Sequence, residues 1–189
     1  MSAALPGAVR AAGTSIEVWF QDEARVGQQG TLTQVWAETG SRPRAPKDLR
    51  TEWATLFGAV CAERGVGAAL VMPHCDAEAM TLHLAEISRA VVAGAHAVVV
   101  LDGAGWHQAG GRLKVGTNIS LLHLPPYSPE LNPVETVWEY LRANKLSNSA
   151  FDSYDRIVDR CCAAWNWLAD APDRIRSIAA APWTKTVTA

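Results

Sequence analysis

The segment from Leu124 to Trp138 reads LPPYSPELNPVETVW and contains four prolines. Each proline fixes its own φ angle and biases the residue before it toward an extended backbone. The apolar run that follows, up to Leu146, has helical periodicity and carries the acid Glu135 near its start. A stiff segment directly before a helix fixes where the helix begins. We therefore expect this segment to aim the helix start, and Glu135 with it, at the edge of a sheet.

Glu135 also has a purely structural interpretation. Pro133 can occupy the first helical position, because its missing N–H group is not needed there. Asn132 would then be the N-cap and Glu135 the third helical residue, which makes a capping-box arrangement. The helix dipole would stabilise a carboxylate at this position as well. Taken alone, this segment leaves both interpretations open.

The first part of the chain has the pattern of strands. The stretches 15–24, 31–38 and 51–63 are rich in β-branched and aromatic residues, and the connections between them suggest an antiparallel meander. A loop before the third stretch carries basic side chains, which could follow a DNA backbone or could simply be solvated. These basic residues are Arg42, Arg44, Lys47 and Arg50.

The second part alternates helices and strands. Asp76–Gly94 has the period of an amphipathic helix, with Asp76 as N-cap and Gly94 as its stop. The wholly apolar run at 96–104 predicts a central strand buried on both faces, and 118–129 predicts a fifth strand. Helical patterns follow at 132–146, 151–169 and 172–180.

Together these elements predict an α/β fold with a mixed five-stranded sheet flanked by helices. We expect one domain at residues 15–182, after a loose N-terminal lead of residues 1–14 and before a C-terminal tail of residues 183–189.

Two aspartates join Glu135 as candidate site residues. Asp22 lies inside a strand with Val18 and Phe20 on its side, so it should point toward the apolar face. A buried carboxylate without a partner is costly and needs a cation. Asp102 follows the buried strand and precedes a glycine. It is either a turn residue or a residue at the strand end, where α/β sheets usually bind ligands.

These three carboxylates would repel each other and take up protons if they were close together without metal ions between them. Carboxylate oxygens are preferred ligands of Mg²⁺, which keeps open positions for substrate phosphate. Two ions about 3.5–4 Å apart can hold the attacking and leaving oxygens of phosphoryl transfer in line. The set Asp22, Asp102 and Glu135 therefore predicts a site with two divalent cations, Mg²⁺ or Mn²⁺.

Three motifs carry a resemblance to a known family. FQDEAR at 20–25, VVVLDGAGWH at 98–107 and the proline-rich segment resemble the DDE transposases, in particular the bacterial insertion-sequence branch of the mariner superfamily. The resemblance implies a ribonuclease-H-like fold and assigns a catalytic, metal-binding triad by position: Asp22, Asp102 and Glu135. It also implies cleavage of DNA at element ends by metal-activated water, followed by attack of the freed 3′-hydroxyl on target DNA.

The resemblance extends to one histidine and to the partners. His107 matches the family's histidine after the second aspartate, where it either lies near the scissile phosphate or is a hydrogen-bonded structural residue. The family implies DNA as substrate and a homodimer in the active complex. Full-length relatives carry helix-turn-helix DNA-binding domains before the first aspartate. Too few residues precede Asp22 for such a domain, so we expect the catalytic half alone, as a second reading frame, a truncated copy or an isolated segment.

Composition and charge limit the alternatives. The formal net charge of −2 gives no global basic field, although a local basic groove can lie in a neutral protein. The four cysteines form no CxxC pair, and the sequence predicts neither a signal peptide nor a membrane span. With the bacterial resemblance, we expect the protein in the cytoplasm, associated with the nucleoid when it acts on DNA. Two other functions remain: a ribonuclease-H-like nuclease without strand transfer, and a non-catalytic transposon remnant.

Overall fold

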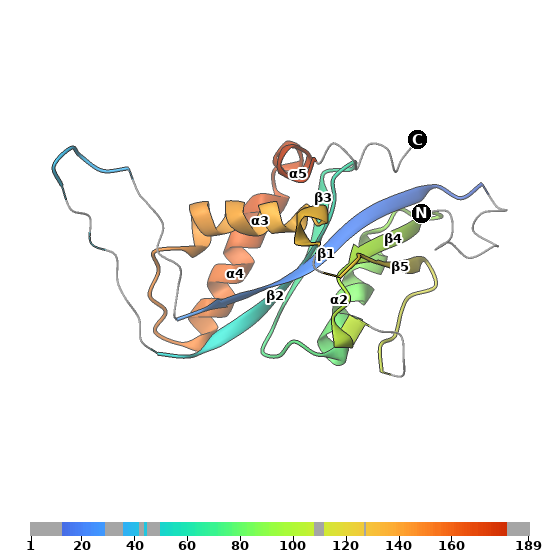
Figure 1. Ribbon diagram of the computed structural model, residues 1–189, viewed down its shortest axis with the longest axis horizontal. Helices are drawn as coiled ribbons and strands as arrows, with labels where there is room; N and C mark the ends of the chain where they lie inside the picture. Colours follow the sequence, from blue (N-terminus) through green and yellow to red (C-terminus); the bar gives the residue numbers. More distant parts are fainter. Residues whose placement is uncertain are drawn as a thin grey trace.

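The structure, a computed structural model, describes residues 13–28, 36–41, 44, 50–107, 112–126 and 128–180. Its centre is a five-stranded sheet in the order β3-β2-β1-β4-β5 (Figure 1). The pairs β1–β2 and β2–β3 are antiparallel, whereas β1–β4 and β4–β5 are parallel. The predicted mixed five-stranded sheet is confirmed. The strands are β1 (Ile16–Gly27), β2 (Trp53–Cys61), β3 (Val66–Met72), β4 (His96–Leu101) and β5 (Ile119–His123).

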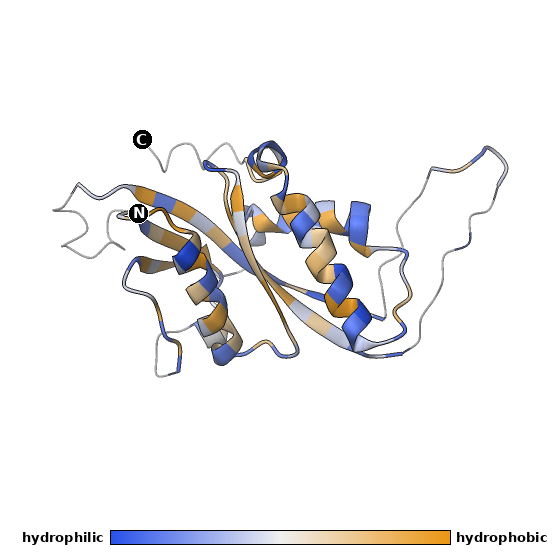
Figure 2. Ribbon diagram, turned by 180° about the vertical axis from the view of Figure 1, so that it is seen from behind, coloured by the Kyte–Doolittle hydropathy of each residue, from blue (hydrophilic) through white to orange (hydrophobic). Residues whose placement is uncertain are grey.

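Helices cover both faces of this sheet. The helix α2 (Ala77–Ala90) packs on one face, and α3 (Val134–Leu141) and α4 (Tyr154–Ala169) pack on the other. Hydrophilic and apolar residues alternate along α4, as expected for a helix with one buried side (Figure 2). The remaining helical segments are η2 (Gly105–His107), η3 (Pro129–Leu131), η4 (Arg142–Leu146), which is a π-helical continuation of α3, and α5 (Pro172–Ile178).

The antiparallel part of the sheet differs from the prediction in one strand. Of the strand predicted at 31–38, residues 31–35 lie outside the described residues, and residues 36–38 are not in a strand. The third antiparallel strand is β3, which follows β2 through a turn with Gly65 at a φ of +68°. Its sequence VGAALVM contains glycine and alanine, which strands disfavour, so the pattern is weak. Pairing with β2 along seven residues compensates for that weakness.

The helix α2 begins as predicted and ends earlier. The carboxylate of Asp76 accepts hydrogen bonds from two backbone N–H groups of the first turn. The helix ends at Ala90 rather than at Gly94, because the last carbonyl groups find other partners. The Nη1 of Arg64 donates to the Ala90 carbonyl oxygen at 2.8 Å. Gly94, with a φ of +83°, instead lies in the turn that leads into β4.

The strand β1 separates two hydrophobic clusters. Trp19 is fully buried on the α2 side, and its neighbour Phe20 is buried on the side of α3 and α4. The strict alternation of side chains along a strand then places Asp22 on the same side as Phe20, as the sequence predicted. In contrast, Glu23 faces the α2 side.

The predicted terminal segments are only partly described. Residues 1–12 of the N-terminal lead and residues 183–189 of the C-terminal tail lie outside the described residues. Within the described part of the chain, no helix combines the length and the apolar character that a bilayer span requires.

Candidate active site

Asp22, Asp102 and Glu135 line one open pocket with a volume of about 330 Å³. The three acids come from β1, from the loop after β4, and from the first turn of α3. The pocket therefore lies at the carboxyl end of β4, where β1 continues beyond its parallel neighbour. The rest of the lining is Gly103, Ala104, Leu124, Pro125, Pro126, Ser128, Pro129 and Asn132.

The proline-rich segment forms one wall of this pocket and is fixed at both ends. At its start, the backbone N–H group of Leu124 donates to the Leu101 carbonyl oxygen at 2.8 Å. At its end, the buried Asn132 donates from Nδ2 to the carbonyl oxygen of Gln21 at 2.9 Å. Gln21 directly precedes Asp22, so the bond of Asn132 holds the start of α3 beside the first acid. The prediction that this segment aims the helix start at the sheet is confirmed.

Of the two hydrogen bonds of the predicted capping box, the structure forms a cap from Asn132 and lacks the bond to Glu135. The Oδ1 of Asn132 accepts from the Val134 N–H group at 3.2 Å, which is a cap of the helix start. The backbone N–H group of Asn132 donates to the Pro129 carbonyl oxygen at 2.8 Å, rather than to the carboxylate of Glu135 as in a capping box. The carboxylate of Glu135 is exposed and lines the pocket. It is therefore available for chemistry.

Asp22 is half-buried against α3. Its Oδ2 accepts a hydrogen bond of 2.9 Å from Nε1 of the buried Trp138. Burial, and secondarily the negative charge of Glu135, raises the pKa of Asp22 to about 7. A positive ion in the pocket would lower that pKa.

A glycine makes the contact between Asp22 and Trp138 possible. Gly58 of β2 is the register partner of Asp22. A Cβ atom at Gly58 would lie 2.4 Å from Cη2 of Trp138 and 2.8 Å from Cζ3 of Trp165. The missing side chain thus leaves the space that the indole of Trp138 occupies below the acid.

Asp102 combines both roles that the sequence left open. Its Oδ1 accepts from the Ala104 N–H group at 3.0 Å, which is the bond of a turn residue. The side chain is nevertheless 57% exposed and lines the pocket. The same Oδ1 lies 2.7 Å from Nδ1 of His107.

His107 links Asp102 to a further acid that the sequence analysis missed. The side chain of His107 is 1% exposed, and its Nε2 lies 2.8 Å from Oε1 of Glu23. Burial alone lowers the pKa of His107, but the hydrogen bond and charge of Glu23, together with Asp102, outweigh burial and raise it. Glu23 also accepts from Gln21 Nε2 at 3.0 Å. Both ring nitrogens of His107 thus face carboxylates, which favours a role in positioning Asp102.

The pocket has the donor types of a divalent cation site. Three carboxylates converge on it, and such oxygens suit Mg²⁺ and Mn²⁺. Among the described residues, no three His, Cys, Asp or Glu side chains are already close enough together to surround one ion. Burial and, secondarily, the charge of Glu135 raise the pKa of Asp22, and a cation between the acids would lower it.

The predicted basic loop residues do not line this pocket in the part of the chain that is described. Arg42 and Lys47 lie outside the described residues, and Arg44 is exposed. Arg50 donates from Nη2 to the Phe151 carbonyl oxygen at 2.8 Å and pairs with Asp152 at 3.8 Å. Arg50 therefore ties the start of β2 to the segment before α4.

Comparisons with known proteins identify relatives of this chain. The family model described as "DDE superfamily endonuclease" matches residues 17–158. A curated relative, the uncharacterized protein y4pE/y4sA of Sinorhizobium fredii (strain NBRC 101917 / NGR234), is 60% identical over 131 residues, which are 69% of this chain and 96% of the relative.

Two solved structures show the fold. The Mos1 strand transfer complex has a TM-score of 0.60 at 14% identity, and the mariner Mos1 paired end complex with Mg has a TM-score of 0.62 at 15% identity. Each match covers 86% of this chain, and 50% and 51% of the respective Mos1 chain. The chain thus spans about half the length of those proteins, and the likeness confirms the ribonuclease-H-like fold.

Proposed function

The chain belongs to the DDE superfamily of endonucleases, and from this we propose that it is the catalytic domain of a DNA transposase. Its reactions would be hydrolysis of a phosphodiester bond of DNA and then attack of the freed 3′-hydroxyl on a phosphodiester of target DNA, which joins the two strands and releases the 3′-oxygen of the target strand. The observation that carries the proposal is one pocket lined by Asp22, Asp102 and Glu135, each from a different element. Support comes from the likeness of the fold to the Mos1 strand transfer complex and to the Mos1 paired end complexes with Mg and Mn.

Two divalent cations would neutralise the charge that develops on the phosphate oxygens and would activate water at neutral pH. In this proposal, Asp22, Asp102 and Glu135 hold those cations through their carboxylates. Trp138 orients Asp22 by donating to its Oδ2. Asn132 and the prolines hold Glu135 in the pocket wall. The third carboxylate is therefore already in position before the reaction begins, and no entropy is lost in positioning it then.

His107 and Glu23 would act through Asp102 rather than on the substrate. A carboxylate that is hydrogen-bonded by a second residue keeps its orientation toward a metal, and such supporting residues tune metal affinity. Glu23 holds the imidazole ring from the buried side, and Nδ1 of His107 lies 3.2 Å from the backbone carbonyl oxygen of Asp102 and 2.7 Å from its Oδ1. We assign both as positioning residues for the metal-binding carboxylate.

The partners follow from the same proposal. The substrate is DNA, the active complex is a homodimer, and a helix-turn-helix segment, fused or separate, supplies recognition of the element ends. Arg42, Arg44 and Lys47 remain candidate contacts to the DNA backbone. Without a recognition segment, the described domain should bind DNA weakly and with little sequence preference.

A gel assay with a labelled duplex that carries the element's own end tests the proposal. With Mg²⁺ or Mn²⁺ we expect nicked product, and with a target duplex we expect joined product. Asp102→Asn should abolish both products. Nicking without joining would favour a ribonuclease-H-like nuclease, and the absence of both products from the wild-type chain paired with its recognition segment would indicate a non-catalytic remnant.

A further inference from the structure

Beyond Asp22, strands β1 and β2 continue as a two-stranded ribbon. β4 pairs with β1 only as far as Phe20, whereas β2 pairs with β1 as far as Gly27. Beyond Phe20, no described strand pairs with this edge of β1, and the Gln21 carbonyl oxygen beside Asp22 accepts from Asn132 Nδ2. One face of the ribbon is buried in the cluster of α3 and α4, through Ala24, Val26, Ala54 and Leu56. Because side chains alternate along a strand, Arg25 and Trp53 lie on the opposite face. The end of the β1–β2 ribbon lies away from α2 (Figure 1).

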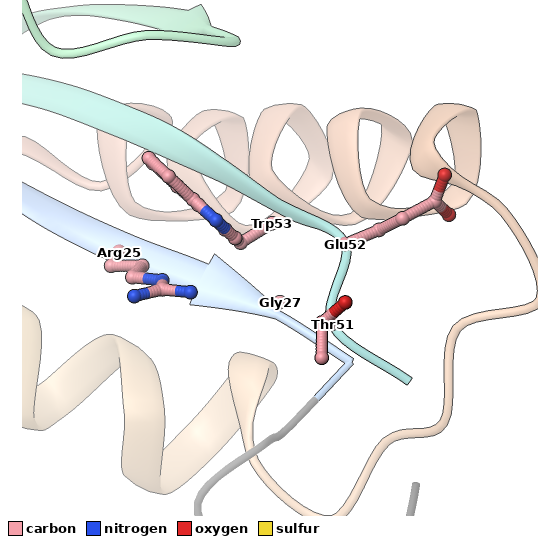
Figure 3. Close-up of a pocket in the computed structure, with 5 residues that line it drawn as sticks. All are labelled: Arg25, Gly27, Thr51, Glu52 and Trp53. Carbon is pink, nitrogen blue, oxygen red and sulfur yellow. The ribbon is translucent and has the colours of Figure 1, made fainter. Parts of the chain in front are cut away.

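Arg25 and Trp53 form a platform beside a second pocket of about 260 Å³ (Figure 3). The guanidinium carbon of Arg25 lies 4.3 Å from the centre of the Trp53 ring. Gly27 is the register partner of Trp53, and a Cβ atom there would come within 2.7 Å of the Trp53 Cβ. Any larger residue at position 27 would push Trp53 away, so the glycine keeps the indole in position to stack.

Arg25 is exposed, and within the described residues its guanidinium has no carboxylate partner. The acid that lines the same pocket, Glu52, is already engaged by Gln28. Its Oε2 accepts from Gln28 Nε2 at 3.4 Å, and its backbone N–H group donates to Gln28 Oε1 at 3.0 Å. Stacking on an indole uses the face of a guanidinium and leaves the N–H groups at its edge free. The platform thus offers planar, oriented donors for an anion.

The position of the platform identifies the anion. Arg25 lies about 10 Å beyond Asp22 along the strand, at about 3.3 Å per residue. That distance equals the rise of about three nucleotides of one DNA strand, at about 3.4 Å each. A DNA strand that crosses β1 beyond Phe20 can contact Asp22 on one face of the ribbon and Arg25 on the other. Given the proposed function, on which this inference rests, we propose that Arg25, held by Trp53, binds a backbone phosphate of the same strand about three nucleotides from the reacting phosphate.

The chemistry of the site fits a phosphate diester. The guanidinium fork can donate two parallel hydrogen bonds to two phosphate oxygens, a geometry that lysine cannot reproduce. A phosphate contact carries no sequence information, so it positions the strand without selecting it. The platform would therefore set how far the reacting phosphate lies from the pocket.

Fluorescence anisotropy with a short labelled duplex of arbitrary sequence tests the proposal over a series of salt concentrations. The full chain is used, without added metal, as wild type, Arg25→Gln, Arg25→Lys and the control Arg89→Gln. Arg89 is an exposed arginine of α2 that pairs with Glu86. Arg25→Gln should bind about tenfold more weakly, as expected for loss of a charge-assisted hydrogen bond. The slope of log affinity against log salt concentration should be smaller in magnitude by about 0.9 for this variant than for the wild type.

The other two variants separate the geometry of the guanidinium from the net charge of the protein. Arg25→Lys should keep the salt slope and still lose affinity, because the charge remains and the fork does not. Arg89→Gln should match the wild type in both quantities. If Arg25→Gln binds the duplex like the wild type while the wild type still cleaves DNA, the proposed role of the platform in binding phosphate is wrong and the proposed function stands. Equal losses in Arg25→Gln and Arg89→Gln would attribute the effect to net charge and overturn the platform. A wild type that neither binds nor cleaves DNA would overturn both proposals.

Discussion

The indole Nε1 of Trp138 donates a hydrogen bond of 2.9 Å to Oδ2 of Asp22. Trp138 lies one turn after Glu135 on α3, so the helix that supplies the third acid also orients the first. The strand β1 and the helix α3 are joined a second time by the bond from Asn132 to Gln21. Two acids from distant parts of the sequence are thus held in one rigid arrangement.

Trp138→Phe should keep most of the packing and remove the hydrogen bond to Asp22. A hydrogen bond to a charged group contributes about 1.5–3 kcal/mol. We therefore expect the free energy of unfolding to fall by an amount toward the lower end of that range, and DNA cleavage to weaken. Trp165→Phe is the control, because Trp165 packs against Trp138 at a ring-centre distance of 6.1 Å. Urea unfolding at pH 8 measures the stability loss. Cleavage that falls equally in both variants would contradict the orienting role of Trp138.

The stability of the metal-free protein should fall as the pH rises through about 7. The pKa of Asp22 is about 7 in the folded protein, against 3.8 ordinarily, mainly because of burial. The folded state then binds the proton more tightly than the unfolded state. The stabilising contribution of protonated Asp22 is fully present below pH 3.8 and is lost as the pH rises through 7. Urea midpoints at a series of pH values measure this slope.

Two comparisons check that the slope belongs to Asp22. Asp22→Asn should unfold with a flatter pH dependence, because the titrating group is gone. Mg²⁺ should flatten the slope of the wild type, because a cation in the pocket lowers the pKa of Asp22. A slope that persists unchanged in Asp22→Asn would assign the pH dependence to another group.

Glu135→Gln should fold normally and lose DNA cleavage by orders of magnitude. Glutamine also serves at the third position of a capping box, so the capping role alone predicts retained activity. Glu139→Gln is the matched control, because Glu139 lies one turn later on α3 and is exposed outside the pocket lining. We expect it to cleave at close to the wild-type rate. Cleavage in Mg²⁺ by Glu135→Gln near the parent rate would remove Glu135 from the triad.

Glu23→Gln should weaken the binding of Mn²⁺ by about 10–100-fold, which is the usual cost of losing a residue that supports a metal ligand. Glutamine keeps the size of the side chain and loses the carboxylate that holds His107 Nε2. Calorimetric titration with Mn²⁺ measures the affinity, with Glu86→Gln on the surface of α2 as the control. Asp102→Asn should lose more affinity than Glu23→Gln. The reverse order would make Glu23, and not Asp102, the main ligand.

The sequence predicted the parts of this molecule whose causes are local. The cap at Asp76, the buried strand β4 and the proline-rich segment before α3 each depend on a few adjacent residues. In contrast, β3 could not be predicted from VGAALVM, because its stability comes from pairing with β2 rather than from its own residues.

The same limit applies to the site. Asp22, Asp102 and Glu135 were found because each has an unusual local setting: an acid in a strand, an acid at a strand end, and an acid after prolines. Glu23 was missed, since its importance depends on η2 bringing His107 back against β1. The Arg25–Trp53 platform likewise depends on the register of β1 with β2.

The acids Asp22 and Glu23 are neighbours in β1 and face opposite sides of the sheet, one toward Trp138 and the other toward His107. In genetic terms, the gene segment for β1 should not tolerate the insertion or deletion of a single codon between Ile16 and Asp22. One added or lost codon would turn Asp22 toward His107 and Glu23 toward Trp138, and it would disable the pocket without removing any acid from the chain.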